Sequence, residues 1–475
     1  MDLGPKSFMY GRKGPWPQPS PAHPQGEAFA VIHLPFIEKL DWWIHIGSRY
    51  MYSLGMAPFM LLKALFFNGL SPVSDTEFHA ILTNSMMSKF LCPKLDEDDL
   101  INFKDVLEEG ERYMITDLQA VQTVKPYKGI HVSATKTLFK MKMNDANEME
   151  YEVVAIYVFK TNELFRPTDG DAWELAKYFV LQGGAICATL VVHPNLHFPL
   201  DAINAITKTS LPKKHPIVQL LKPHMRFTLP LENAVLTFGL SVLKNKPWMS
   251  YAPYPGHYDG LRDLLVEGFT GIKGNDSYPP YEFPMNPPKI YSKYGDFQQA
   301  YFDVMYTFVS KVLEKVDPND RYVISWANYI SEHVPGFPSG SEIFEGDNLV
   351  RAVTSYFWSI TVAHSIDHYN YGEMDVRKVP MRLRQAPPVK GVKMNPLSKL
   401  VTPIDQMKYL MCMKMFFGPT NVTTLYKSKY KFEVEHGLES AVQEFKKEME
   451  DLEKLMIEKG MNYIPLKEIA ASIQY

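Results

Sequence analysis

Two hydrophobic periodicities alternate along this chain. Apolar residues recur with the 3.6-residue period of a helix from about Phe36 to Phe90, and again from Asp171 almost to the end. Between Tyr113 and Phe165 the period changes to two, in segments rich in β-branched and aromatic residues. The pattern therefore predicts a mainly α-helical protein with a small antiparallel β meander near its N-terminal third.

Proline- and glycine-rich stretches mark the predicted boundaries. Residues 12–26 are dense in Pro, Gly and Gln, which predicts an extended leader over about residues 1–30. The remaining chain, 31–475, is interpreted as a single domain with its β subdomain at about 111–166. A second span rich in Pro, Gly and Tyr, 253–291, predicts a long loop of the kind that covers a site.

The most apolar stretch runs from Met56 to Leu70 and is interrupted by Pro58, Lys63 and Asn68. It is shorter than the ~20 residues of a membrane span. We predict a buried helix here, and the alternative is an interfacial helix that touches lipid.

Charge and cysteine content exclude some classes of protein. The 475-residue chain has a formal net charge of −3 and no dense basic run, so we expect no nucleic-acid partner. Its three widely spaced cysteines argue against a disulfide framework and favour a reducing compartment. Because the first residues lack an apolar signal core, we expect a cytoplasmic protein.

Two histidine pairs carry the candidate chemistry. His193 and His197 are four residues apart, and so are His364 and His368, which places each pair on one face of a helix. A single such pair among 14 histidines is unremarkable and could be structural. Both pairs follow apolar runs, however, and buried imidazoles need partners. Two facing pairs would offer four nitrogen ligands to one transition metal, such as iron, copper, nickel or zinc.

Five blocks of sequence, in the same order, resemble the lipoxygenase family, and together they span roughly Tyr113 to Tyr475. The block around the second histidine pair, His364-Ser-Ile-Asp-His368, resembles the family's second ligand helix. The other blocks are Asp171-Ala-Trp-Glu-Leu-Ala-Lys177, His215-Pro-Ile-Val-Gln-Leu-Leu-Lys-Pro-His224-Met-Arg226, Met381-Arg-Leu-Arg-Gln-Ala-Pro-Pro388 and the C-terminal run Tyr463–Tyr475. Within this resemblance His215 and His224 are scaffold residues.

The resemblance implies a helical catalytic domain with one non-haem metal, iron or alternatively manganese. Its ligands would be His193, His197, His364, His368 and the main-chain carboxylate of the final residue, Tyr475. No catalytic side chain is implied beyond a hydroxide that the metal carries. Because the metal must change oxidation state, zinc is excluded. About 110 residues precede the matching region without the strand pattern of the family's N-terminal β-sandwich, so we expect a compact, catalytic-domain-only form.

The chain departs from the family's pattern at several positions. The tight spacing of His193 and His197 resembles that of some fungal members, including manganese-using ones. The small residue that steers oxygen in the family falls at the bulkier Val235 or Leu236, in the predicted substrate or oxygen pocket.

Three further departures concern residues around the metal ligands. Thr189 and Tyr371 stand where plant-type members carry glutamines, and we assign both to the same pocket. Ala471 stands where the family usually has Asn. Residues around metal ligands tune the metal, so the substrate or the redox behaviour is expected to differ.

Three functions remain open. The first is a dioxygenase that inserts O2 into a polyunsaturated fatty acid by hydrogen abstraction from a bis-allylic methylene, giving a hydroperoxide. The second is an oxidase or isomerase of the same fold that acts on a fatty acid hydroperoxide or a specialised metabolite. The third is a non-catalytic lipid-binding protein, against which four buried histidines argue. For all three, a lipid is the expected partner, and peripheral contact with a membrane is consistent with it.

Overall fold

The structure is a computed structural model that describes residues 9–12, 29–33, 36–67, 69–143, 149–228, 235, 238–418 and 423–473. Most of the predicted leader at 12–26 lies outside the described residues. On either side of it, β1 (Met9–Arg12) and β2 (Phe29–His33) pair in antiparallel fashion.

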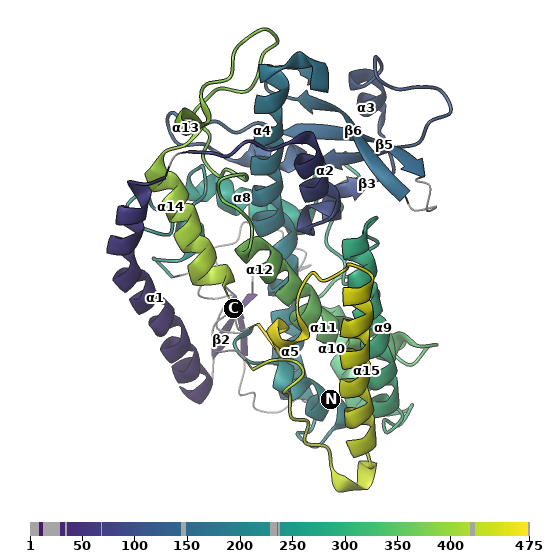
Figure 1. Cartoon of the computed structure of the whole chain (residues 1–475). Helices are drawn as coiled ribbons and strands as arrows, with labels where there is room; N and C mark the ends of the chain where they lie inside the picture. The colour runs from purple at the N-terminus through teal and green to yellow at the C-terminus, as the bar shows by residue number, and fades with distance from the viewer. Residues whose placement is uncertain are drawn as a thin grey trace.

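The predicted mainly α-helical architecture is confirmed (Figure 1). A first helical region precedes the β meander. The helices are α1 (Phe36–Ala64), α2 (Asp75–Thr83), η1 (Met86–Phe90) and α3 (Glu97–Asn102). The strands are β3 (Leu91–Cys92), β4 (Tyr113–Asp117), β5 (Thr135–Met143), β6 (Met149–Val158) and β7 (Glu163–Phe165). They form one antiparallel sheet in chain order, as the period of two predicts.

The sheet separates two apolar clusters because its side chains alternate. Phe139 and Ile156 face the main core, which includes α4, whereas Leu138 and Ala155 face a smaller cluster around Phe103. The β subdomain is thereby joined to the helical body through one face of the sheet.

A central run of helix passes through the middle of the molecule (Figure 1). It consists of α4 (Asp171–Cys187), the π-helical turn η4 (Ala188–Val192), the 3-10 turn η5 (His193–Leu196) and α5 (Phe198–Ser210). By length and composition this run could cross a membrane, but 94% of its most apolar window is buried inside the protein. It is therefore the core helix of the fold.

The other helices surround this core. They are α6 (Pro216–Leu221), α8 (Tyr258–Thr270), α9 (Lys293–Leu313), α10 (Arg321–Ser331), α11 (Asn348–Trp358), α12 (His364–Gly372), α13 (Leu397–Leu400), α14 (Pro403–Cys412) and α15 (Glu439–Glu458). Two more π-helical turns are η8 (Ser359–Ala363) and η9 (Met413–Phe417). Short 3-10 turns are η2 (Gln119–Thr123), η3 (Pro167–Asp169), η6 (Lys222–His224), η7 (Val242–Lys244), η10 (Val434–His436) and η11 (Leu466–Glu468).

Two expectations from the sequence are wrong. The predicted loop 253–291 contains the helix α8, whose buried Leu261, Leu264 and Phe269 follow a helical period that the surrounding Pro and Gly content obscured. The predicted burial of Met56–Leu70 also fails, because Leu61 and Phe66 are 59% and 81% exposed. A sequence that is apolar on every side of a helix does not distinguish the protein core from another apolar environment.

Candidate metal centre

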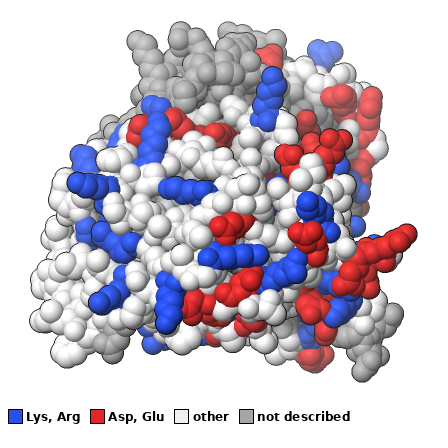
Figure 2. All heavy atoms as spheres, turned by 90° about the horizontal axis from the view of Figure 1, so that it is seen from above, with Lys and Arg blue, Asp and Glu red and all other residues white. Residues whose placement is uncertain are grey.

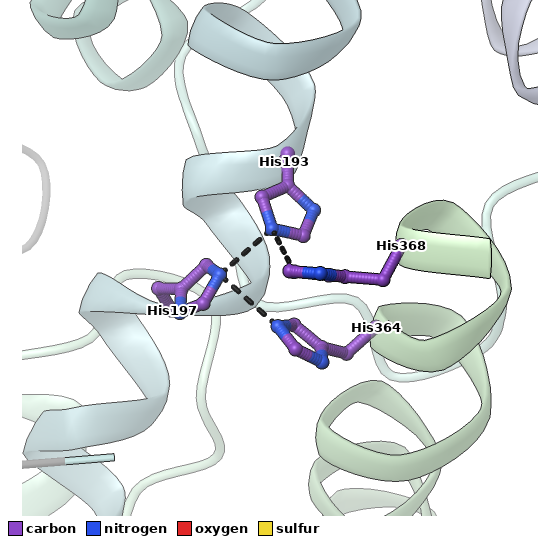
Figure 3. A group of neighbouring side chains, drawn as sticks. All are labelled: His193, His197, His364 and His368. Carbon is purple, nitrogen blue, oxygen red and sulfur yellow. Dashed lines mark hydrogen bonds between the residues drawn. The ribbon is translucent and has the colours of Figure 1, made fainter. Parts of the chain in front are cut away.

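Four imidazoles converge between the central helix and α12 (Figure 3). The Nε2 atom of His193 lies 2.8 Å from that of His197 and 3.0 Å from that of His368. The Nε2 atoms of His364 and His197 are 3.2 Å apart. All four rings contribute one nitrogen to a group whose members lie within 4.8 Å of one another. The structure thus brings together residues up to 175 positions apart in the chain.

The backbone at the first pair is not the regular α-helix that its spacing suggested. The π-helical turn η4 ends at Val192, and His193 begins a 3-10 turn that contains Pro194. Because proline has no N–H and its ring disturbs the preceding turn, the helix cannot continue unchanged through this point. A second π-helical turn, η8, ends directly before His364. Such turns often occur at functional sites, and here each one directly precedes a histidine pair.

The spacing of the nitrogens suits a metal ion. Two ligands at right angles, each about 2.1 Å from one ion, are about 3.0 Å apart. The three measured Nε2 separations of 2.8, 3.0 and 3.2 Å bracket that value. Without a shared metal ion, the nitrogen lone pairs of four neutral imidazoles would not be expected to converge on one point. The four-histidine group is therefore compatible with a transition-metal site.

Burial favours the neutral form of the imidazoles, in which a ring nitrogen can bind a metal. Burial, reinforced by the neighbouring His193, lowers the pKa of His197 well below its usual value. Burial and the other rings of the cluster likewise lower the pKa values of His364 and His368. These three imidazoles are thus neutral at pH 7, which is the protonation state that binds a metal.

A carboxylate that the sequence interpretation did not single out supports the cluster. Asp367 Oδ2 lies 3.6 Å from His193 Nδ1, while Asp367 Oδ1 accepts hydrogen bonds from Lys89 Nζ at 2.5 Å and Tyr294 Oη at 2.9 Å. Burial alone would raise the pKa of Asp367, but Lys89 and His193 lower it to about 2. The ionised carboxylate faces the far side of the His193 ring and so directs Nε2 toward the cluster. The position of Asp367 between His364 and His368 in the sequence could have indicated its role, whereas no sequence pattern indicates Lys89 or Tyr294.

We expect Asp367→Asn to weaken metal retention by roughly 10- to 100-fold, the usual effect of losing a carboxylate behind a ligating histidine. Metal per chain, measured during competition with a chelator, checks this without any assay of turnover. Asp405→Asn is the matched control, because Asp405 is a buried carboxylate paired with Arg382 at 2.9 Å. Equal metal loss in both variants would contradict a specific role for Asp367.

The last described residues are fixed beside α12. The Ala470 N–H donates to Ser365 Oγ at 3.0 Å, one residue from His364. Ser472 Oγ donates to the Arg226 carbonyl at 3.1 Å, and His224 Nδ1 donates to the Ala471 carbonyl at 2.6 Å. Burial lowers the pKa of His224 to about 3, so it stays a neutral donor. His224 is thus placed as a clamp on the C-terminal segment. Tyr475, the fifth predicted ligand, lies outside the described residues.

In a chain that ends at Tyr475, we expect Tyr475→Ile to keep its metal, because the terminal carboxylate is unchanged. Adding residues beyond Tyr475 moves that carboxylate by roughly 3.3–3.6 Å per residue and should release the metal. Plasma mass spectrometry of the two proteins measures the difference. If the aromatic side chain matters instead, the ranking reverses, with the Ile variant impaired and the extended chain unaffected.

An apolar cavity of about 110 Å³ adjoins the histidines. Its lining includes Thr189 and Val235, two of the predicted pocket residues, while Leu236 lies outside the described residues. The Thr189 hydroxyl is turned back to the Ala185 carbonyl at 2.9 Å. Tyr371 is not among the residues that line this cavity. Its ring packs at a tilt against Phe417, which does line it, with ring centroids 4.5 Å apart.

Apart from His193, His197 and His368, the other lining residues gave no sequence signal. The remaining wall comes from Leu190, His193, Pro194, His197, Phe198, Val242, Leu243, Tyr254, Leu265, His368, Phe416 and Phe417. Phe416 and Phe417 reach the cavity from η9, far from both histidine pairs in sequence. His215 lies outside the cluster and pairs with Asp320 at 3.2 Å. Its position is that of a scaffold residue.

Comparisons with known proteins agree with this fold. The family profile named Lipoxygenase matches residues 121–236. The epidermal-type polyunsaturated fatty acid (12S)/(13S)-lipoxygenase of Rattus norvegicus is 23% identical over 61% of this chain and 46% of its own length. Hydroperoxide isomerase ALOXE3 of the same species is 25% identical over 47% of this chain and 33% of its own length. The chain therefore spans about half, or less, of these curated relatives.

Solved structures show the same fold. Coral 8R-lipoxygenase superposes with a TM-score of 0.73 at 16% identity, over 99% of this chain and 79% of that one. Manganese lipoxygenase of Gaeumannomyces graminis superposes with a TM-score of 0.69 at 15% identity, over 98% of this chain and 96% of that one. The fold is mainly helical, and it contains a four-histidine cluster that is compatible with a metal site. The chain resembles the lipoxygenase family in sequence over residues 121–236 and in fold over nearly its whole length.

Proposed function

We propose that this protein is a non-haem metal dioxygenase that inserts O2 into a polyunsaturated fatty acid and forms a hydroperoxide. The observation that carries the proposal is the convergence of four buried imidazole nitrogens at the edge of an apolar cavity. The relative from Rattus norvegicus is named for polyunsaturated fatty acids, which supports the substrate class.

His193, His197, His364 and His368 would hold the metal, with iron as the first candidate and manganese as the alternative. A metal that cycles between two oxidation states supplies the one-electron oxidation of a bis-allylic methylene. Leu190, Leu265 and Phe417 contribute apolar walls that orient a hydrocarbon chain and exclude water. The described lining contains no Lys or Arg, so nothing in it selects a fatty acid by its carboxylate.

Lys177 and Arg226, which end two of the sequence blocks that resemble the family, are engaged elsewhere. Lys177 is buried and donates to the Val73 carbonyl at 2.7 Å, and Arg226 is paired with Asp41 at 2.9 Å. We therefore expect entry with the apolar tail first, and expect methyl esters to react about as well as free acids.

The small volume of the cavity favours a second candidate function. Its volume of about 110 Å³ is small beside the roughly 300–1,000 Å³ of most ligand sites. Val235 and Phe416 narrow the space in which O2 would meet a substrate radical. A protein that rearranges a fatty acid hydroperoxide needs no separate O2, and the similarity to a hydroperoxide isomerase supports this reaction.

One paired assay separates the candidates. Protein reconstituted with iron or manganese is given linoleate in an oxygen electrode, and separately linoleate hydroperoxide in the absence of O2. O2 uptake with conjugated-diene formation supports the dioxygenase, whereas loss of hydroperoxide without O2 uptake supports the isomerase. If fully metal-loaded protein does neither, the proposal of an oxidoreductase fails. A protein that binds lipid but retains no metal would belong to the non-catalytic class.

A further inference from the structure

The outward side of α1 is a continuous apolar surface. Of the 23 large hydrophobic side chains exposed among the described residues, 12 lie between Phe36 and Phe66. We call these 12 the α1 outer face: Phe36, Leu40, Trp43, Ile44, Met51, Tyr52, Leu54, Phe59, Leu61, Leu62, Leu65 and Phe66. About half of the exposed large apolar side chains among the described residues are thus concentrated on α1 and the turn that follows it, at the edge of the molecule (Figure 1).

The opposite stripe of the same helix is buried, so α1 is apolar on both sides. The buried positions recur with the helical period: Trp42, Ile46, Arg49, Ser53, Met60 and Ala64. An amphipathic surface helix would instead present charged residues to water. The outer face presents on the order of 1,000 Å² of apolar surface, beyond the roughly 300–600 Å² of the largest patch on a typical monomer.

The outer face has few groups that need a polar partner. Within residues 40–66, the one exposed charged side chain is Lys63. The exposed Ser48 donates its hydroxyl to the His45 carbonyl at 2.6 Å. Asp41, at the edge of the face, is engaged by Arg226 at 2.9 Å. Ser48 and Asp41 are therefore satisfied within the chain.

We propose that the α1 outer face docks this protein on a lipid bilayer, with α1 lying in the plane of the membrane surface. A protein interface usually forms about one hydrogen bond per 100–200 Å², and this face offers almost no donors or acceptors for them. A bilayer requires none. Trp43 and Tyr52 are residue types that favour the headgroup level, where an aromatic ring meets water.

The elements beside α1 suit an anionic lipid headgroup. Trp248 is 69% exposed in the loop that follows η7, and Lys246 Nζ lies 5.7 Å from its ring. Nearby in that loop, Tyr251 contacts Tyr50 of α1, with ring centroids 5.7 Å apart. Figure 2, which views the molecule from above, shows several Lys and Arg side chains among uncharged areas on the left. The loop that contacts α1 thus carries a basic and an aromatic side chain together, Lys246 and Trp248.

The docked helix adjoins the cavity. Tyr50, on the inner side of α1, contacts Phe416 with ring centroids 6.4 Å apart, and Phe416 lines the cavity beside the histidines. If the substrate is a fatty acid, as proposed above, a protein docked through α1 could take it from the bilayer across this single aromatic layer. This part of the inference rests on the proposed function, whereas the docking itself does not.

Flotation of the full chain with phosphatidylcholine vesicles, with and without phosphatidylserine, tests the proposal. We expect binding to both, and at least about a tenfold loss of partitioning in the double variant Leu54→Glu/Leu62→Glu. The matched control is Leu455→Glu/Ile457→Glu, which changes two exposed apolar residues of α15 and should bind like the parent. Quenching of tryptophan fluorescence by brominated lipid should decrease in Trp43→Phe.

Three results would overturn the proposal. The first is a full chain that fails to bind vesicles, and the second is a Leu54→Glu/Leu62→Glu variant that binds them as well as the parent. The third result is a parent protein that binds no vesicles but forms a concentration-dependent dimer, which the double substitution disrupts. Metal content and turnover of detergent-dispersed linoleate should be unchanged in both double variants. An inactive protein that still binds vesicles therefore refutes only the proposed reaction, and an active one that does not bind refutes only the docking.

Discussion

Replacing His364 with alanine is expected to abolish metal retention and turnover together. The His364 ring is fully buried, and its Nε2 lies 3.2 Å from that of His197, so the remaining three imidazoles would face an apolar void instead of a fourth ligand. Metal per chain is measured by plasma mass spectrometry after dialysis, and turnover is measured with linoleate and its hydroperoxide.

The control for His364→Ala is His215→Ala. His215 is also buried, but its partner is Asp320 at 3.2 Å and it lies outside the cluster. We expect this variant to unfold at lower denaturant concentration and to keep its metal. Full metal occupancy with normal turnover in His364→Ala would remove that residue from the site.

The sequence singled out the four histidines because a spacing of four places two side chains on one face of a regular helix. Only His364 and His368 lie on such a helix, whereas His193 begins a 3-10 turn. The sequence did not predict the π-helical turns η4 and η8, which directly precede the two histidine pairs. The residues of these turns, Ala188–Val192 and Ser359–Ala363, resemble an ordinary apolar α-helix. Pro194 was the visible sign of a distorted backbone at His193.

Contacts across distant segments were the least predictable. Lys89 and Tyr294 meet Asp367 from η1 and α9, and no local pattern links these three positions. The burial of α1 was unpredictable for a different reason. Its residues are apolar on every side, so the pattern fixes the helix but leaves its surroundings undetermined.

Substituting Gly268 with alanine is expected to displace the backbone that precedes His193. An added Cβ would lie 2.6 Å from the Val191 carbonyl oxygen and 3.1 Å from the Val191 Cα. Both atoms belong to the backbone of Val191 in η4, which packs against α8, so neither atom can move away alone. Overpacking of this kind costs about 1–3 kcal/mol, which exceeds the gain of up to about 1 kcal/mol for alanine over glycine in a helix.

Denaturant unfolding and metal per chain test this substitution together. Because Val191 lies two residues before His193, a shift of η4 moves a ligand as well as the core, and we expect Gly268→Ala to lower both stability and metal retention. Gly47→Ala is the control, since no heavy atom lies within 4 Å of its added Cβ. That variant should keep its metal and be as stable as the parent, or more stable by up to about 1 kcal/mol. If Gly268→Ala is as stable as Gly47→Ala and retains as much metal, the contact between α8 and η4 does not hold His193 in place. Asp367 must then hold His193 without help from the π-helical turn.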